Sequence, residues 1–395
     1  MYHPINLPDC PPLERFNELI RLLLAFGLEQ TLHLTEAEIK PLFEQHFADN
    51  DFPEAGSWFW GKPVKIREPL LRLLVIPVAQ KQAVLAAFVA DLDLVGRFGD
   101  GRLQALNLPE ANYEALTIVG EIVQNCYTDI LATNGVPADK LKMDAPLDRQ
   151  TVLRAYLDAQ NRRRVNGRLS PLKVCPGCDG KPPSVSDGKI HEDLDHFFPK
   201  SRYPLLAVHL LNLTPFCKDC NQTYKGTKDA ILDDDAQVTD VHCLHDIYHP
   251  YLRPALSDVE VRVERDAEGS PQVVLQPVHN DQQQLARLQS LLYTLNVNSR
   301  WSGDLIEERL RPKLEMFLMY GWQTEWEQDN WQVDVDKLRD GLETAVATLS
   351  RFIGREPGNV ATLAYAQWLV GNEAGLRDWL AVETAVMDAP VYQRG

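Results

Sequence analysis

The sequence has few cysteines, no long apolar run and no internal repeat. Seven cysteines in 395 residues are too few, and too unevenly spread, for a disulfide-stapled secreted protein. No uninterrupted apolar stretch approaches the roughly 20 residues that a membrane-spanning helix needs. The first residues also lack the basic segment followed by an apolar segment that is typical of a secretory signal. We therefore expect a cytoplasmic protein in a reducing compartment, with no membrane partner.

Positive charge is scarce overall but is concentrated in one segment. The chain carries 56 acidic and 40 basic side chains, a net charge of −16, which favours solubility over general adhesion to nucleic acid. Residues 151–230 hold 13 basic and 8 acidic side chains, so the net charge divides into +5 for this segment and −21 for the rest. A locally basic segment in an acidic chain suits a confined site for a polyanion.

Helical periodicity dominates the two ends of the chain. A length of 395 residues predicts two or three domains. Apolar residues recur at steps of three and four from about residue 12 to 160, and again from 281 to 384. We interpret these stripes as core packing and assign no chemistry to them. The helices expected in the first half are 68–96 with a break at Pro77, 116–131, and 148–163.

One strong β signal lies between these helical regions. Residues 259–265 alternate apolar and polar, and 272–278 form a second, less regular apolar run. The turn-forming residues 266–269 separate the two runs, so the pattern predicts a β-hairpin.

Two Cys-x-x-Cys pairs are the most specific chemical feature. They are Cys175-Pro-Gly-Cys178 and Cys217-Lys-Asp-Cys220. Each turn holds two sulfurs on one side of an ion, and two turns complete a closed tetrahedron, so the pattern predicts a structural zinc site. The 38 intervening residues exceed the roughly 15–20 of a simple zinc ribbon, so the zinc would clamp the base of an inserted element. The alternatives are a redox dithiol pair or unpaired thiols.

Three fragments around these cysteines carry a resemblance to a known family. They are Leu-Asp-His-Phe-Phe-Pro-Lys-Ser at 194–201, Asn-Leu-Thr-Pro-Phe-Cys at 212–217, and Cys-Asn-Gln-Thr-Tyr-Lys-Gly at 220–226. Residues 170–230 resemble the HNH nuclease family, whose ββα-metal core is often stapled by such a zinc. The resemblance implies metal-dependent hydrolysis of a phosphodiester.

The resemblance also implies a role for each matching residue. His196 would be the general base, since a neutral imidazole can take the proton of an attacking water. Asp195 and Asn221 would hold a catalytic Mg²⁺ or Mn²⁺ through hard oxygen ligands. Asn212 would brace the loop that carries the base. Neighbouring strand residues point to opposite faces, so the strand must end, bulge or twist for Asp195 and His196 to share one site.

Basic residues lie on both sides of these motifs. Double-stranded DNA is the expected partner, and RNA is less favoured because no stacked-aromatic motif is present. A solvated basic face is the alternative, above all for the arginine run. The predicted nucleic-acid contacts are Arg162, Arg163, Arg164, Arg168, Lys200, Arg202, Lys225 and Lys228.

Other conspicuous residues have weaker interpretations. His191 and His209 could contact substrate but match no motif. A second metal site is one interpretation of the group formed by His242, Cys243, His245 and His249; packing in a flanking domain is favoured. The tryptophans could stack on bases, but core or interface positions are favoured; they are Trp58, Trp60, Trp322, Trp326 and Trp331.

Together these observations predict a predominantly α-helical α+β protein. The expected parts are a helical N-terminal domain (1–165), a zinc-stapled ββα-metal HNH core (166–232), a linker with a hairpin (233–280) and a helical C-terminal domain (281–395). The expected function is cleavage of DNA phosphodiesters, one strand per site, with the acidic flanks gating the core. By architecture the protein is similar to effector nucleases of bacterial anti-phage systems, including the Zorya type, which would imply partner proteins from such a system. The alternatives are a restriction- or homing-type endonuclease and a non-enzymatic zinc module that binds nucleic acid.

Overall fold

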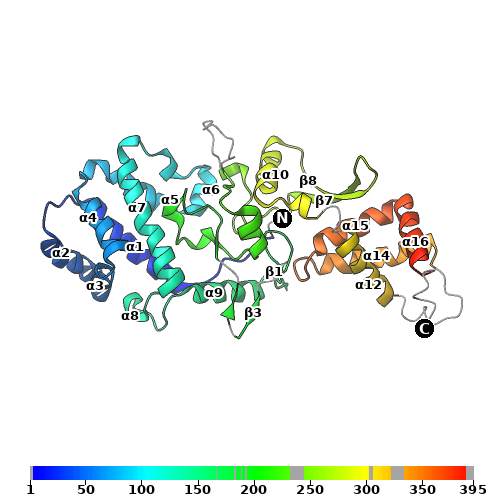
Figure 1. Ribbon diagram of the computed structural model, residues 1–395, viewed down its shortest axis with the longest axis horizontal. Helices are drawn as coiled ribbons and strands as arrows, with labels where there is room; N and C mark the ends of the chain where they lie inside the picture. Colours follow the sequence, from blue (N-terminus) through cyan, green and yellow to red (C-terminus); the bar gives the residue numbers. More distant parts are fainter. Residues whose placement is uncertain are drawn as a thin grey trace.

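The protein is elongated, with helices at both ends and the short strands near the middle (Figure 1). The computed structural model describes residues 3–165, 167–181, 184–187, 189–191, 194–231, 244–301, 306–321 and 333–387. Cys243 and His242 lie outside these residues, as do Trp322, Trp326 and Trp331. Within the described part the chain is mostly helical with few, short strands, as the sequence predicts.

The N-terminal part is a set of helices that begin and end where the sequence signals them. Pro77 follows the end of α4, and a short 3₁₀ turn separates α4 from α5, so the expected break is confirmed. The helix expected at 116–131 begins three residues earlier and continues as a π-helix, Cys126–Asn134, up to Gly135 at φ 71°. Asp148 caps α9 by accepting from the Thr151 amide at 2.7 Å. The helices are α1 (Pro11–Glu29), α2 (Glu36–Asp49), α3 (Pro53–Trp60), α4 (Glu68–Val75), α5 (Gln82–Leu92), α6 (Leu94–Asp100), α7 (Tyr113–Asn125), α8 (Ala138–Leu141) and α9 (Arg149–Asn161).

The strands form antiparallel pairs, and in the described residues each pair stands alone. The longest pair is β7 with β8, with register from Val259↔Pro277 to Arg265↔Pro271, which confirms the expected hairpin. The other pairs have two residues per strand. The strands are β1 (Arg164–Val165) with β2 (Arg168–Leu169), β3 (Val185–Ser186) with β4 (Lys189–Ile190), β5 (Asp195–His196) with β6 (Leu213–Thr214), and β7 (Val259–Arg265) with β8 (Pro271–Pro277).

Helices resume after the hairpin. Asp281 caps the first of them by accepting from the Gln284 amide at 2.8 Å. The helices of this part are α10 (Gln282–Leu295), α11 (Val297–Arg300), α12 (Arg311–Gly321), α14 (Val335–Arg351), α15 (Asn359–Gly371) and α16 (Glu373–Met387), with a π-helical turn at Ile306–Leu310. Among the described residues no single helix has the length and apolar character to cross a membrane; one bent pair, Pro63–Val75 with Val78–Leu92, meets both measures at an angle of 114°.

The central segment shares its buried side chains with both flanks. Ile190, Leu194 and Leu213 belong to the apolar core of the N-terminal helices. Phe197 and Phe216 belong to a second core that includes the C-terminal helices. The central segment therefore contributes buried side chains to the cores on both sides of it.

Candidate functional site

The four paired cysteines lie together in the second core. Their sulfurs are all within 4.8 Å of one another. The Sγ atoms of Cys175 and Cys220 are 3.8 Å apart, and those of Cys178 and Cys217 are 3.7 Å apart. A tetrahedral zinc with Zn–S bonds of about 2.3 Å needs sulfurs about 3.8 Å apart. The cluster is therefore close enough to hold one metal ion without a change of the backbone, which fits the predicted zinc.

The surroundings of the cluster favour thiolates and leave little room. The guanidinium of Arg300, at the end of α11, donates to the Cys220 sulfur at 3.1 Å and lies over the Tyr224 ring at 4.2 Å. A Cβ atom added at Gly180 would lie 2.9 Å from the Cys178 sulfur. The turn that holds Cys175 and Cys178, called the first knuckle below, thus requires glycine at 180. The Arg300 guanidinium, from the C-terminal part, faces the sulfurs.

Asp179, next to the first knuckle, connects it to both ends of the chain. Its carboxylate is fully buried and lies 2.7 Å from Nε2 of His3. The other carboxylate oxygen accepts the Val360 amide at 2.9 Å, at the start of α15, where a negative charge is favourable. The cysteine cluster is therefore fixed to the segment before α1, through His3, and to the C-terminal helices at once.

The β5–β6 pair places the family-matching residues. Asp195 pairs with Thr214 and His196 pairs with Leu213. The strand ends directly after His196, where the Phe197 amide donates to the Asn212 carbonyl at 2.8 Å. Asp195 and His196 consequently line the same pocket, and the short strand resolves the conflict expected for neighbouring strand residues.

Asn212 is buried, and every hydrogen-bonding group of its side chain has a partner. Its Oδ1 accepts the Phe198 amide at 2.7 Å, and its Nδ2 donates to the carbonyls of Phe198 at 3.1 Å and Leu206 at 3.0 Å. These bonds hold the loop that leaves His196 and returns to β6. The contacts fit the bracing role implied by the family and leave no group for proton transfer.

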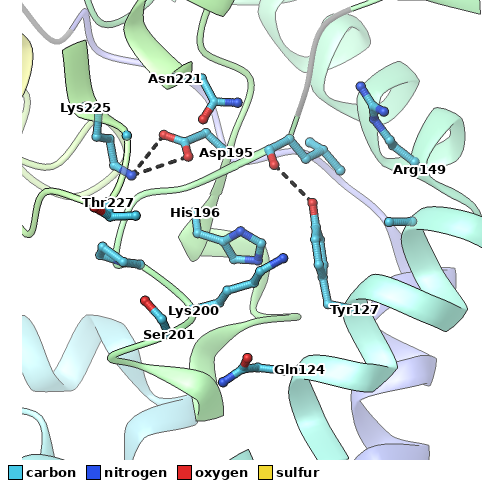
Figure 2. A pocket seen from close by; sticks show the side chains of 14 residues that line it. Gln124, Tyr127, Arg149, Asp195, His196, Lys200, Ser201, Asn221, Lys225 and Thr227 are labelled. Atoms are coloured by element: carbon cyan, nitrogen blue, oxygen red, sulfur yellow. Dashed lines mark hydrogen bonds and ion pairs between the residues drawn. The ribbon is translucent and has the colours of Figure 1, made fainter. Parts of the chain in front are cut away.

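A pocket of about 500 Å³ lies between the central segment and the N-terminal helices. In Figure 2, Asp195 lies between Asn221 and Lys225, with His196 below it and Tyr127 on the far side of the imidazole. The polar side chains of the lining are Gln124, Tyr127, Arg149, Asp195, His196, Lys200, Ser201, Asn221, Lys225 and Thr227.

The tautomer of His196 is fixed by the backbone. Its Nε2 donates to the carbonyl of Ala207 at 2.8 Å; because a carbonyl can only accept, Nδ1 carries the lone pair. Burial lowers the pKa of His196, the Ala207 hydrogen bond opposes this, and the charges of Lys200 and Lys225 add to it, so that the pKa is about 3. The imidazole is therefore neutral near pH 7 and able to accept a proton.

Asp195 is held by a lysine. The Lys225 ammonium lies 3.2 and 3.3 Å from the two oxygens of the Asp195 carboxylate, and the Lys225 side chain is 1% exposed. Asn221 and Lys225 come from one π-helical turn, Asp219–Lys225, which ends at Gly226. Asp195 and Asn221 offer the hard oxygen donors that a Mg²⁺-type ion prefers. The donor set fits such an ion, although the carboxylate already has a cationic partner.

The predicted nucleic-acid contacts form two groups: one lies close to the pocket, and the other, the arginine run, lies away from it. Lys200 lines the pocket, with its ammonium 4.8 Å from the centre of the Tyr127 ring. Arg202 lies 3.9 Å from the Asp229 carboxylate, and the Lys228 ammonium donates to the Tyr293 carbonyl at 3.1 Å. Both lie close to the pocket in sequence, but neither belongs to its lining.

The arginine run lies away from the pocket. α9 carries Arg149 at its pocket end, and its 13 residues place Arg162 about 20 Å further along the axis. Arg162, Arg164 and Arg168 are exposed there. Arg163 is 5% exposed, and its guanidinium donates to the carbonyls of Ser170 and Pro4. The structure therefore argues against Arg163 as a phosphate contact, because its charge is committed to backbone carbonyls inside the protein.

The sequence interpretation missed the N-terminal contribution to the pocket. Gln124, Tyr127 and Arg149 lie on helices that had been interpreted as core packing alone. A polar face interrupts the apolar stripe at these residues, but this is common on any surface helix. Only the packing of these helices against β5 distinguishes the three polar residues from those on any other surface helix.

The remaining histidines have structural partners. His209 donates to the Leu92 carbonyl at 2.9 Å, and the ring of His249 lies against Phe197 at 4.5 Å. His191 is exposed and bonds to the Ser186 hydroxyl at 2.7 Å. His245 lies 3.1 Å from the Gly99 carbonyl. Among the described residues, the only group of three or more potential ligands that could hold a metal ion is the four cysteines.

Comparisons with known proteins give little information on function. No protein-family model matches the chain, and no solved structure matches it. A stretch of 117 residues is 36% identical to Protein ea31 of Escherichia phage lambda. The match covers 30% of this chain and 31% of that protein, so the chain spans about a third of its length. The similarity assigns neither a family nor an activity.

Proposed function

We propose that the protein is a metal-dependent endonuclease of the HNH type that hydrolyses DNA phosphodiester bonds. The observation that carries this proposal is the shared pocket of Asp195, His196 and Asn221, lined by Arg149, Lys200 and Lys225. A general base, two hard oxygen donors and several cations are the groups that hydrolysis of a phosphodiester requires.

In the proposed reaction the Nδ1 atom of His196 takes the proton of the attacking water. The Nε2–Ala207 hydrogen bond keeps the imidazole in the tautomer that can do so. Asp195 and Asn221 would hold Mg²⁺ or Mn²⁺, which supplies positive charge to the phosphate and to the leaving 3′-oxygen. Lys200 and Arg149 offer further positive charge to the scissile phosphate. Asn212 positions the loop and takes no part in proton transfer.

The cysteine cluster would bind Zn²⁺ in a structural role. Four thiolates complete a tetrahedron and leave no coordination position for substrate. The cluster joins the Cys175–Cys178 turn to the helical turn that carries Asn221, because Cys220 directly precedes that residue. Loss of zinc would therefore release the start of the helical turn that places Asn221 in the pocket.

Cleavage of supercoiled plasmid DNA by the full chain tests the proposal. With Mg²⁺ or Mn²⁺ we expect conversion to the open-circular form, since one such site holds one scissile strand. His196→Ala should abolish conversion, while His191→Ala, at an exposed histidine outside the pocket, should retain it. Chelation followed by an excess of Mg²⁺ should restore cleavage. An intact plasmid under all of these conditions would refute the proposal.

The proposed biological role is defence of a bacterium against phage. A role in bacterial anti-phage defence rests on the similarity of architecture to effector nucleases with helical flanks. Cleavage mapping on modified and unmodified DNA distinguishes this role from a restriction- or homing-type enzyme. Gating by the acidic flanks predicts that physiological partners raise the rate of the full chain.

One observation favours a second candidate, a zinc module that binds nucleic acid without cutting it. Lys225 already neutralises Asp195, as would be the case in a site that holds no divalent ion. In that event the protein would bind duplex DNA with equal affinity with and without Mg²⁺, and His196→Ala would change no measured property.

A further inference from the structure

The pairing of Lys225 with Asp195 has a consequence for the order in which the pocket fills. We infer that Lys225 weakens divalent-metal binding at Asp195, so that the metal binds tightly only together with a phosphodiester anion. The inference rests on the proposed function. It assigns to Lys225 the role of coupling metal affinity to substrate binding.

The geometry puts the lysine in competition with a metal ion. Its ammonium is within 3.3 Å of both oxygens of Asp195. Lys225 is the last residue of the π-helical turn, whose Asn221 carbonyl accepts the Gly226 amide at 2.8 Å. The backbone at the root of the side chain is thus fixed, which keeps the ammonium close to the carboxylate.

Burial makes this competition strong. Asp195 is 6% exposed and Lys225 is 2% exposed, so water screens their charges poorly and Coulomb interactions reach further than in bulk water. An ion bound to Asp195 would lie within a few ångström of the ammonium. Repulsion between the two cations then subtracts from the affinity of the carboxylate for the metal.

The other charged side chains of the lining also oppose metal binding in the absence of an anion. Asp195 is the one acidic side chain of the pocket lining, whereas Arg149, Lys200 and Lys225 are basic. The described lining therefore has excess positive charge before any ion enters. A phosphodiester supplies a negative charge, an oxygen ligand for the metal and an acceptor for the Lys225 ammonium. Coupling of this kind is reciprocal, so the metal must strengthen phosphate binding by the same factor.

Titration of Mn²⁺ into the zinc-loaded full chain without DNA, followed by calorimetry, tests the inference directly. Lys225→Met keeps the length of the side chain and removes the charge. We expect it to bind Mn²⁺ roughly tenfold or more tightly than the wild type, whereas Lys225→Arg, the charge-preserving control, should bind no more tightly than wild type. Asp195→Asn should remove the site in every background. Mn²⁺ prefers oxygen ligands over thiolates, so the cysteine cluster does not obscure the titration.

The second arm needs no change at Lys225 and remains informative if that variant folds poorly. Mn²⁺ is titrated into His196→Ala protein with and without a short phosphorothioate duplex. We expect the duplex to tighten Mn²⁺ binding roughly tenfold. Equal Mn²⁺ affinity with and without duplex, or unchanged affinity in a folded Lys225→Met variant, would overturn the inference. If Mn²⁺ behaves as expected but the wild type leaves plasmid uncut, the inference survives and the proposed nuclease function fails.

Discussion

The ring of Tyr127 stands edge-on against the imidazole of His196, with ring centroids 4.2 Å apart and planes 75° apart. Tyr127 also donates its hydroxyl hydrogen to the Leu194 carbonyl at 3.0 Å, one residue before β5. The π-helical turn that carries Tyr127 belongs to the N-terminal helices. A residue outside the family-like segment therefore positions the histidine within it.

Tyr127 variants should separate its ring from its hydroxyl. Tyr127→Ala removes the wall against which the imidazole packs and should lower kcat about 10- to 100-fold, since small misplacements of a catalytic group are costly. Tyr127→Phe keeps the ring and loses one hydrogen bond, so kcat should fall only severalfold. Both kcat and KM of plasmid nicking should be measured. An equal loss in the two variants would show that the ring contact does not matter.

The sequence predicted the parts of this site that depend on local interactions, but not the parts that depend on tertiary packing. Asp195, His196 and Asn221 were predicted to share a site because they lie in short motifs, and they line one pocket. The cysteine spacing predicted a cluster that the sulfur positions match. The expected hairpin and the break at Pro77 depend on local backbone preferences and are confirmed. The role of Tyr127 depends on how helices pack 60 residues or more away from β5, which no local pattern specifies.

The burial and the partners of the charged residues were the hardest features to predict from the sequence. Arg163 and Arg164 are neighbours in a basic run, but the first is buried against carbonyls and the second is exposed. Lys225 was expected to contact nucleic acid; it lines the pocket, but its ammonium is also paired with the buried Asp195 carboxylate. A sequence shows the sign of a charge, whereas its partner is decided by tertiary packing.

Asn212 should be essential for stability as well as for activity. Asn212→Leu preserves volume but leaves the Phe198 amide and the Phe198 carbonyl without their partner in a buried loop, while the Leu206 carbonyl keeps only its bond from the His209 amide. Unsatisfied buried groups of this kind cost about 1–3 kcal/mol each, so the free energy of unfolding should fall by about 2–5 kcal/mol. Urea denaturation measures this loss. A change below about 0.5 kcal/mol, the range of ordinary surface substitutions, would mean that the loop does not depend on Asn212.

Removal of the structural metal should unfold the centre of the protein. The full chain should contain one zinc per molecule by elemental analysis, and Cys220→Ser should lower both the zinc content and the melting temperature. Gly180→Ala provides an independent test, because its Cβ would lie 2.9 Å from the Cys178 sulfur although no ligand is changed. Wild-type zinc content and melting temperature in Gly180→Ala would contradict the packing described for the first knuckle.

Two arginines of α9 and its following hairpin make a matched pair for DNA binding. Arg149 lines the pocket, whereas Arg168 is exposed beyond the other end of the helix. Arg149→Gln should weaken binding of a non-cleavable duplex and reduce the salt dependence of the affinity by about one phosphate contact. Arg168→Gln should change neither quantity if the pocket alone binds DNA. Fluorescence anisotropy at several salt concentrations gives both values, and the opposite ranking would move the interface to the arginine run.

The buried histidines should make the fold sensitive to acid. Burial lowers the pKa of His249 to about 3 from the ordinary 6.5, and burial also lowers the pKa of His209. Between these values the unfolded chain binds more protons than the folded one, so stability is complete above about pH 6.5 and is lost progressively as the pH falls towards 3. His249→Asn retains an acceptor for the Tyr251 and Leu252 amides, which His249 Nδ1 accepts at 3.3 Å. This variant should melt at a lower temperature than wild type at pH 7, because aromatic contacts are lost, but should lose less stability between pH 7 and pH 5. His33→Asn, at an exposed position, is the control and should follow the wild type, and parallel pH profiles for all three proteins would contradict the assignment of acid sensitivity to His249.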